Sequence, residues 1–487
     1  MIKRFGIPAI FASIGKSLPA LIALAALCVA CVSTTRAHVT LIKIGDGVVD
    51  ASALTFRADP PNVNGATFQQ DAVHTFADWQ YVVYYDGERH ACIARRHLPG
   101  GSWQVIRLLD YHFKSNDGHN VISLGICARD GTIHLAFDHH VSPLHYRVSK
   151  AGVATHPDEV TWSASLFGPV RSDLEEGKPI VITYPRFWST PDGGLQFHYR
   201  RGNSGNGDNM LVDYQAENGK WSNTRQIDSR AGEYRDEMGS SPHRNAYPNG
   251  YDYDSAGRLQ ATWVWRESAV GVNHDLCYGY SDDRGNTWFN DLGQRIQGPA
   301  RIDTPFLAVE HITLRQGLMN NQAQAIDSKN RIHVVMWFSS TTTSLTAKGG
   351  ELLGPPADRR FHHFWREAPG IWHDDVIPWV AGSRPRMYID THDNLFLIYG
   401  RLHTGAALVG GYYAPSDLVI ATASARNRWQ DWSIVKEEKG PFINEMLADP
   451  TRWKADKIMS VLVQDKPKSP GTPSPLRIID YRFSEEP

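Results

Sequence analysis

The chain is poor in cysteine and has no excess of charge of one sign, and each absence excludes a class of protein. Only 5 of its 487 residues are cysteine. The three beyond the N-terminal segment, Cys92, Cys127 and Cys277, are odd in number and widely spaced, so we expect no disulfide framework. Lysine and arginine number 50 against 52 aspartate and glutamate. Without a basic field, nucleic acid is not expected as a partner.

Long hydrophobic runs are also missing, except for one near the N-terminus. Residues 18–32 form this apolar run, basic residues precede it, and small residues offer a cleavage site before His38. The pattern predicts a signal peptide over residues 1–37 and a mature protein that is periplasmic or secreted. The run is too short and one-sided for a membrane span. A lipoprotein remains an alternative, because Cys31 follows the run, although Cys28 stands where a lipobox would have leucine.

Helical periodicity is missing as well, and a recurring turn-and-strand unit takes its place. A tight turn with glycine, aspartate or asparagine precedes a strand of aromatic and β-branched residues. The unit recurs about every 60–75 residues. Its aligned apolar positions are Ile133, Leu195, Leu259, Ile332 and Leu395, and weaker copies cover residues 79–85 and 458–463. Third strands are expected at residues 145–148, 210–214, 276–280, 361–365, 418–423 and 476–481.

One of these third strands ends in an Asp-box, Ser281-Asp282-Asp283-Arg284-Gly285-Asn286-Thr287-Trp288. In such a turn the aspartate accepts hydrogen bonds from backbone amides and the tryptophan packs below. Residues 217–221 and 426–429 are degraded copies. The repeats and the Asp-box predict an all-β fold, a seven-bladed β-propeller that forms one domain over residues 38–487. The alternatives, a β-helix or a pair of sandwiches, fit the unit length less well.

Strand direction predicts which polar residues share a face. If the turn between the first and second strands faces the bottom, residues before first strands and after second strands gather at the top, around the channel mouth. The candidates found in this way include His119, Asn120, Asp138, His139, His140, Tyr184, Arg200, Arg201, Arg244, Tyr247, Arg266, Glu267, His274, Asn320, Asn321, Arg384 and Arg401. Taken singly, each of these residues is equally well explained as part of the scaffold. As a group they indicate a reactive site.

This set of residues suits β-elimination of a glycosidic bond at C4 of a uronate. A cation must neutralise the carboxylate, a base must remove the weakly acidic C5 proton, and an acid must protonate the leaving oxygen. Histidine and tyrosine can exchange protons, and arginine can hold a carboxylate with two hydrogen bonds. Two alternatives stay open: an exo-glycosidase of the sialidase type and a non-catalytic carbohydrate-binding propeller. The paired carboxylates of other hydrolases have no match, because Asp138 and Glu267 belong to different blades.

Two motifs carry a resemblance to a known group. Gly118-His119-Asn120 and Phe137-Asp138-His139-His140 resemble the signature of the BNR-repeat polysaccharide lyases, which include ulvan lyases and L-rhamnose-α-1,4-D-glucuronate lyases. The resemblance extends over most of the mature chain. It implies a seven-bladed propeller that acts on an acidic polysaccharide, with glucuronate linked to L-rhamnose as the favoured substrate.

The resemblance also implies roles for individual residues. It assigns catalysis to His119, His139, Tyr184 and Arg200, with His140 as the alternative to His139 in register. Tyr184 and His139 are expected to transfer protons, whereas His119 and Arg200 hold the carboxylate. The resemblance also suggests Tyr247 as a substrate contact, and His140, Arg201 and Arg266 are expected to contact the substrate from their places at the strand ends.

No cofactor is required for this chemistry, but a structural ion is an open question. His274 and Cys277 are spaced as two ligands of a structural zinc ion, with His363 as a distant third. A packed Cys277 beside a hydrogen-bonded His274 is the simpler alternative. A calcium ion in the channel would leave no clear mark in the sequence. We expect the protein to be a monomer.

Overall fold

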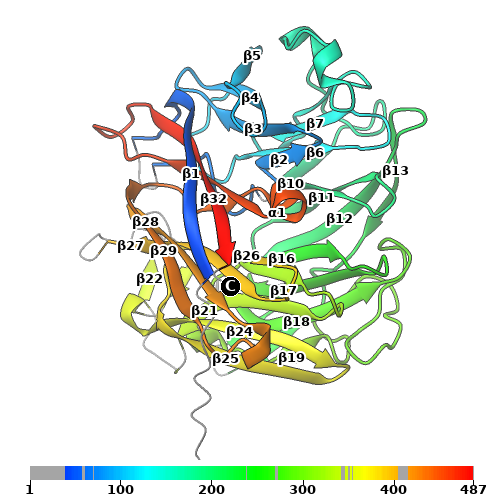
Figure 1. Ribbon diagram of the computed structural model, residues 1–487. Helices are drawn as coiled ribbons and strands as arrows, with labels where there is room; N and C mark the ends of the chain where they lie inside the picture. Colours follow the sequence, from blue (N-terminus) through cyan, green and yellow to red (C-terminus); the bar gives the residue numbers. More distant parts are fainter. Residues whose placement is uncertain are drawn as a thin grey trace, which may run out of the picture.

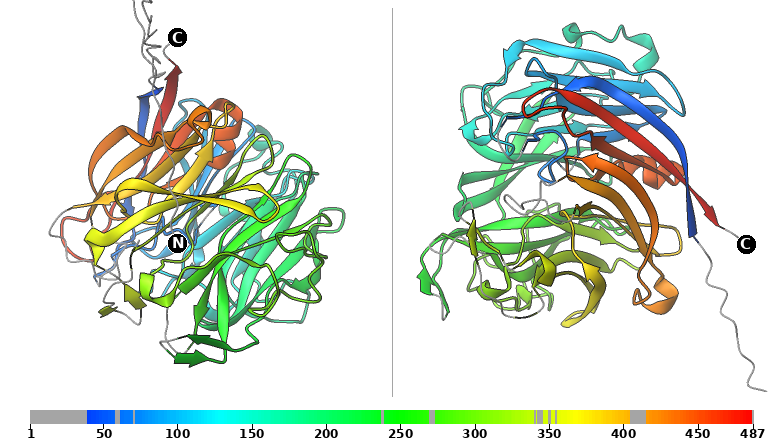
Figure 2. Two further views of the ribbon diagram at one scale, coloured as in Figure 1. Left: turned by 90° about the horizontal axis from the view of Figure 1, so that it is seen from below. Right: turned by 90° about the vertical axis from the view of Figure 1, so that its left-hand side faces the viewer.

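The structure is a computed structural model of the chain, and it describes residues 39–485 except 58–60, 70, 237–238, 269–272, 340, 342–345, 349–350, 354 and 404–414. The predicted signal peptide therefore lies outside the described residues. Seven sheets of three to five strands follow one another around a ring, of which Figure 2 gives two views. The predicted seven-bladed β-propeller is confirmed.

The blades follow one another along the chain. Within each blade, successive strands lie progressively farther from the centre of the ring. The first three blades are β2 (Val73–Phe76), β3 (Trp79–Tyr85), β4 (His90–His97) and β5 (Gln104–His112); β6 (Ile122–Ile126), β7 (Ile133–Phe137) and β9 (Tyr146–Val148); and β8 (His140–Pro143), β10 (Val181–Ser189), β11 (Leu195–Asn203), β12 (Asn206–Gln215) and β13 (Lys220–Gln226). The next three are β16 (Arg244–Tyr253), β17 (Leu259–Glu267), β18 (Asn273–Ser281) and β19 (Ala308–Glu310); β20 (Ala323–Ile326), β21 (Ile332–Ser339), β24 (Arg359–Ala368) and β25 (Ile371–Val380); and β26 (Arg386–Ile389), β27 (Leu395–Leu402), β28 (Ser416–Ala423) and β29 (Ser433–Phe442).

The seventh blade closes the ring with strands from both ends of the chain. It consists of β30 (Leu447–Ala448), β31 (Ile458–Gln464), β32 (Ser474–Glu485) and the N-terminal β1 (Val39–Ala53). β1 and β32 run side by side and antiparallel, with Leu41 opposite Phe483 (Figure 1). This pairing gives the backbone groups along the outer edge of β32 hydrogen-bond partners, and it joins the first residues of the described chain to the last.

Small elements decorate the blades. Two hairpins, β14 (Tyr234–Asp236) with β15 (Gly239–Ser241) and β22 (Thr346–Lys348) with β23 (Glu351–Leu353), lie outside the seven sheets. The helix α1 (Pro450–Asp456) precedes β31, and Asp449 caps it by accepting from the backbone amides of Thr451 and Arg452. Within the part of the chain that the structure describes, no helix has the length and apolar character needed to cross a membrane.

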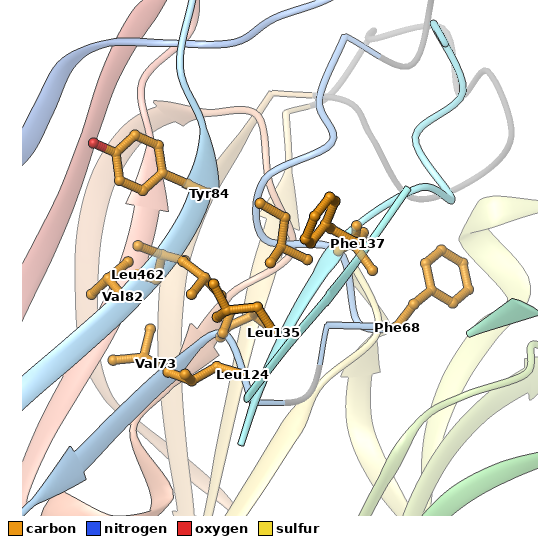
Figure 3. Close-up of a cluster of buried hydrophobic side chains, with 14 of the residues drawn as sticks. Phe68, Val73, Val82, Tyr84, Leu124, Leu135, Phe137 and Leu462 are labelled. Carbon is orange, nitrogen blue, oxygen red and sulfur yellow. The ribbon is translucent and has the colours of Figure 1, made fainter. Parts of the chain in front are cut away.

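Apolar side chains from neighbouring blades pack where the sheets face one another. Figure 3 shows Val82, Leu124, Leu135 and Leu462 pointing into one such cluster, and all four are buried. Strands buried on both faces read as nearly continuous apolar runs, which is why the repeated unit was visible in the sequence. The predicted second and third strands all correspond to strands of the structure.

The Asp-box turn forms as predicted. The Asp283 carboxylate accepts hydrogen bonds from the Thr287 amide (2.6 Å) and the Ser281 hydroxyl (2.8 Å). Trp288 is buried beneath the turn, and its indole nitrogen donates to the Gly285 carbonyl (3.1 Å). The tryptophans of the degraded copies, Trp221 and Trp429, are buried in the same way.

Candidate active site

The candidate site lies where the second and third blades meet, at the end of the ring where β6 and β10 begin and β7 ends, which is the end predicted to form the channel mouth. After β7 the chain first crosses to the next blade, where β8 pairs with β10 and His140 lies opposite Thr183, and only then returns to its own blade as β9. The Val141 amide donates to the Thr183 hydroxyl (2.7 Å) and holds this crossing in place. The consequence is that His140 lies next to Tyr184, although they belong to different units of the sequence.

A carboxylate bridges two histidines at this position. One oxygen of Asp117 accepts from Nδ1 of His119, and the other accepts from Nδ1 of His140 at 2.5 Å. The two imidazole rings stack with their centroids 4.4 Å apart. Burial alone would raise the pKa of the Asp117 carboxyl, but the hydrogen bonds from His119 and His140 outweigh it and hold that pKa below its usual range. Because Nδ1 of each ring faces Asp117, Nε2 is the nitrogen left for a substrate.

Tyr184 completes the cluster and is held in a constrained conformation. Its φ angle of 53° lies in the left-handed region, which tyrosine rarely adopts. Its ring stacks on Phe68 with centroids 4.7 Å apart and planes only 4° from parallel. His140 lies 6.0 Å from the Tyr184 ring on centroids. Backbone strain of this kind concentrates at functional sites, where the surrounding structure enforces it.

Arg200 is a buried cation without a counter-ion. The residue is 1% exposed, and among the described residues no carboxylate lies within ion-pair distance of its guanidinium and no acceptor meets it in ordinary hydrogen-bond geometry. The Tyr247 phenol and the more distant Asp228 carboxylate still interact with its charge. The guanidinium carbon instead lies over two tyrosine rings, 4.8 Å from the Tyr184 centroid and 5.5 Å from that of Tyr247. Because an unpaired buried charge is costly, this arrangement indicates a site for an anion.

Tyr247 responds to that charge. Burial would raise the pKa of the phenol, but the positive charges of Arg200 and Arg266 outweigh it, and the pKa lies below its ordinary value. The hydroxyl is 3.1 Å from the Ser204 hydroxyl. The predicted substrate-contacting residues Tyr247 and Arg266 therefore both lie at the cluster, next to the proposed anion position.

The two sequence motifs are joined by hydrogen bonds at Asp138. Asp138 has a φ angle of 61° and accepts hydrogen bonds from Asn120 and from the Tyr111 hydroxyl (2.5 Å). Asn120 is thereby tied to the turn that leads into His140. The two motifs recognised in the sequence are one hydrogen-bonded unit in space.

His139 is not part of this cluster. It is 1% exposed, and its Nε2 accepts from the His145 backbone amide (2.8 Å). Burial, together with the nearby His145, lowers the pKa of His139 well below its ordinary value. The structure thus places His140, the alternative in register, at the position expected for His139, because the left-handed residue Asp138 changes which side of the chain each histidine faces.

Arg201 also lies elsewhere. As the next residue along β11 it points away from Arg200, its side chain is 54% exposed, and it contacts Asp208 at 3.4 Å. The expectation that Arg201 touches substrate beside Arg200 has no support in this arrangement.

His274 and Cys277, which were predicted as two ligands of a structural ion, each have other partners in the structure. The two ring nitrogens of His274 lie 3.1 Å from Glu267 and 3.0 Å from Asp275, and these carboxylates raise its pKa although burial would lower it. Cys277 is buried in an apolar cluster, and burial raises the pKa of its thiol well above the usual value. His363, the third expected ligand, instead contacts His333 at 3.0 Å.

Two residues of the site, Asp117 and Phe68, are absent from the sequence-based prediction. Asp117 stands two residues before His119, and that spacing was the available signal. Phe68 gave no signal, because it comes from the loop before β2 and reaches the site from another blade. The Arg384 guanidinium lies 4.5 Å from the Phe68 ring centroid and pairs with Glu445 at 2.8 Å, so the loop that carries Phe68 contacts a buried ion pair.

Comparisons with known proteins agree with the fold and the motifs. Residues 79–378, more than half of the chain, match the model of the BNR repeat-containing family. The long isoform of ulvan lyase from Pseudoalteromonas sp. (strain PLSV) is 24% identical over 334 residues, which are 58% of this chain and 33% of that protein. The short isoform from Alteromonas sp. (strain LOR) is 23% identical over 56% of this chain and 58% of that protein. The matched part thus spans a third to little more than half of these relatives.

Solved structures show the same fold. The polysaccharide lyase Uly1 superposes with a TM-score of 0.67 at 17% identity, covering 91% of this chain and 99% of that chain. A PL25 ulvan lyase bound to -[GlcA(1-4)Rha3S]- gives a TM-score of 0.64 at 13% identity, covering 90% and 96%. With the matched family model and the motifs at the channel mouth, these likenesses confirm the resemblance to the BNR-repeat ulvan lyase group. The chain belongs to the BNR repeat-containing family.

Proposed function

We propose that this protein is a polysaccharide lyase that cleaves the glycosidic bond at C4 of a uronate by β-elimination. The observation that carries the proposal is Arg200, a buried guanidinium with no carboxylate of its own, placed beside two tyrosines and a pair of histidines. A uronate carboxylate would supply the missing counter-ion. Neutralising that carboxylate is also what makes the C5 proton removable.

The groups around Arg200 supply the remaining steps. Nε2 of His140 takes the C5 proton, since Asp117 holds the proton of the same ring on Nδ1. The electron pair of the C5–H bond forms the C4–C5 double bond, and the bond from C4 to the leaving oxygen breaks. The Tyr184 hydroxyl gives its proton to that oxygen. Arg200 and His119 hold the carboxylate throughout.

The substrate class is inferred from the relatives. Two of these relatives are named ulvan lyases, and one of the solved structures holds a chain of glucuronate linked 1,4 to sulfated rhamnose. We accordingly propose an exported enzyme that acts on an acidic polysaccharide with glucuronate linked to L-rhamnose. No metal or other cofactor enters the proposed steps.

The product tests the reaction type. Elimination creates an unsaturated uronate conjugated with its carboxylate, which absorbs ultraviolet light, whereas a sialidase-type hydrolase produces reducing ends without that absorbance. A carbohydrate-binding propeller produces neither. Incubation with ulvan should therefore raise ultraviolet absorbance in step with reducing ends.

The assignment of base and acid can be tested separately. A uronate whose C4 substituent is a good leaving group, such as a nitrophenolate, no longer needs an acid. On this substrate the variant Tyr184→Phe should recover most of the wild-type rate, whereas His140→Gln should stay inactive because the C5 proton still needs a base. Recovery by His140→Gln and not by Tyr184→Phe would reverse the two roles.

A further inference from the structure

The carboxylate and the two imidazoles of the candidate site are also a set of potential metal ligands. Asp117, His119 and His140 each offer one ligand atom, and the three atoms lie within 4.8 Å of one another. Among the described residues, no other group of three histidine, cysteine or acidic side chains comes together in this way. Their side chains are 36%, 41% and 30% exposed, so an ion can reach them from solvent.

We propose that Asp117, His119 and His140 form a binding site for a divalent first-row transition ion such as Zn²⁺, and that this ion inhibits the enzyme. Imidazole nitrogen with one carboxylate is a donor set that such ions prefer over Mg²⁺ or Ca²⁺. Ligands about 2.0–2.2 Å from zinc stand about 3.4 Å apart in a tetrahedral site. The three ligand atoms already lie close enough that small rotations of the side chains reach this arrangement.

Two other histidine clusters in the described residues are centred on buried rings that an ion cannot reach. His274 has a carboxylate on each ring nitrogen and is fully buried. His333 is also fully buried, with His363 at 3.0 Å on one nitrogen and Asp327 at 3.3 Å on the other. The cluster at the channel mouth is half open, so a fourth position remains for water or substrate.

Occupancy of this site would stop the proposed reaction for a simple reason. The ring nitrogens that face Asp117 are Nδ1, so an ion held there binds the Nδ1 lone pair, and the neutral ring then carries its proton on Nε2. A ring protonated on Nε2 cannot take the C5 proton. The proton that Nδ1 held before binding moves to Nε2 or to solvent. Inhibition rests on the proposed function, whereas binding does not.

Calorimetric titration of the chelator-treated chain with Zn²⁺ tests the binding. We expect one site per chain, and binding at least about 100-fold weaker in Asp117→Asn and in His140→Gln, because each loses a ligand. His373→Gln is the matched control: His373 pairs with Glu367 at 2.6 Å on the surface, away from this cluster, and should leave the titration unchanged. Circular dichroism checks that each variant is folded.

The spectrum of bound Co²⁺ identifies the donors. The proposal predicts the visible bands of a four- or five-coordinate ion without the intense charge-transfer band of a thiolate. Absence of Zn²⁺ binding, or equal binding by wild type, Asp117→Asn and His140→Gln, would overturn the site. If Zn²⁺ binds as expected while turnover on ulvan is unaffected at saturation, the inhibitory role is overturned and the site stands. If the chain has no lyase activity at all, the proposed function fails and the titration still decides the site.

Discussion

Arg200 and Arg201 show that a buried arginine and an exposed one can be neighbours in the sequence. They are consecutive on β11, so their side chains point to opposite sides of the sheet. Arg200 is buried at the channel mouth without a counter-ion, whereas Arg201 is exposed and contacts Asp208. The sequence suggested both, because two arginines after a second strand look alike until the pleat is known.

Substitution of the two arginines should therefore give opposite results. Arg200→Met should lower kcat/KM on the uronate polysaccharide by about 100-fold or more, since both ground-state binding and neutralisation of the carboxylate are lost. Arg201→Met should stay within about twofold of wild type, as expected for an exposed pair. Initial rates over a range of substrate concentrations provide the measurement. Equal losses in the two variants would mean that the anion position at Arg200 is wrong.

Which of His139 and His140 reaches the candidate site also depends on backbone geometry that the sequence does not reveal. Both follow the end of β7, and strand alternation alone favours neither. The left-handed residues Asp138 and Val141 and the crossing of β8 into the next blade decide it, and none of these has a clear sequence signal. His140→Ala should abolish turnover while the fold is retained, whereas the buried His139→Ala should chiefly lower the midpoint of thermal unfolding. Turnover that survives in His140→Ala would contradict this exchange of roles.

At the scale of the elements, turns and strands were the most predictable parts. The Asp-box was recognisable because its hydrogen bonds depend on a few side chains close in sequence. Asp283→Ala removes the acceptor for Thr287 and Ser281 and should lower the free energy of unfolding by about 1–2 kcal/mol. Asp282→Ala, which removes an exposed pair with Arg258, should change it by less than about 0.5 kcal/mol. Urea unfolding measures both, and a larger effect at Asp282 would contradict the assignment of the turn.

The contacts of His274 with Glu267 and Asp275 lead to a prediction about the pH dependence of stability. The two carboxylates at His274 raise its pKa above the ordinary 6.5 despite burial, so the fold favours the charged ring. The resulting stabilisation is complete below the unfolded pKa and is lost as the pH rises through the folded pKa. The difference in unfolding free energy between wild type and His274→Gln should therefore shrink as the pH rises from about 6.5, the ordinary pKa, through the raised pKa of the folded state. A difference that grows over this range would show that His274 is buried as the neutral ring.

At the scale of the whole molecule, closure of the ring depends on the pairing of β1 with β32, which no local sequence pattern predicts. The seven repeats were visible in the sequence because each strand is apolar and each turn is short. The pairing by which β1 completes the last blade was not visible in the sequence, because a single strand far from its partner carries no sign of that pairing. Phe68 and Glu445 were missed for the same reason: they reach Arg384, which the strand ends did predict for this face, only after the ring has closed.

Closure can be tested at β1. Leu41 is 4% exposed and packs into the cluster between the sixth and seventh blades, whereas Ile44 on the same strand is 41% exposed. Leu41→Ala should lower the free energy of unfolding by about 2–4 kcal/mol through lost burial and a cavity, whereas Ile44→Ala should cost less than about 1 kcal/mol. Thermal and urea unfolding measure the two. Equal costs would mean that β1 is only loosely attached.

The central claim, cleavage by elimination at this site, is tested most directly by the mass balance of a single cut. A defined oligosaccharide of alternating glucuronate and L-rhamnose is incubated with the wild-type protein, and the two product masses are added. Elimination predicts a sum equal to the mass of the substrate, with an unsaturated uronate at the new non-reducing end, and no products from Arg200→Met under the same conditions. A sum that exceeds the substrate by one water molecule would show hydrolysis and contradict the account.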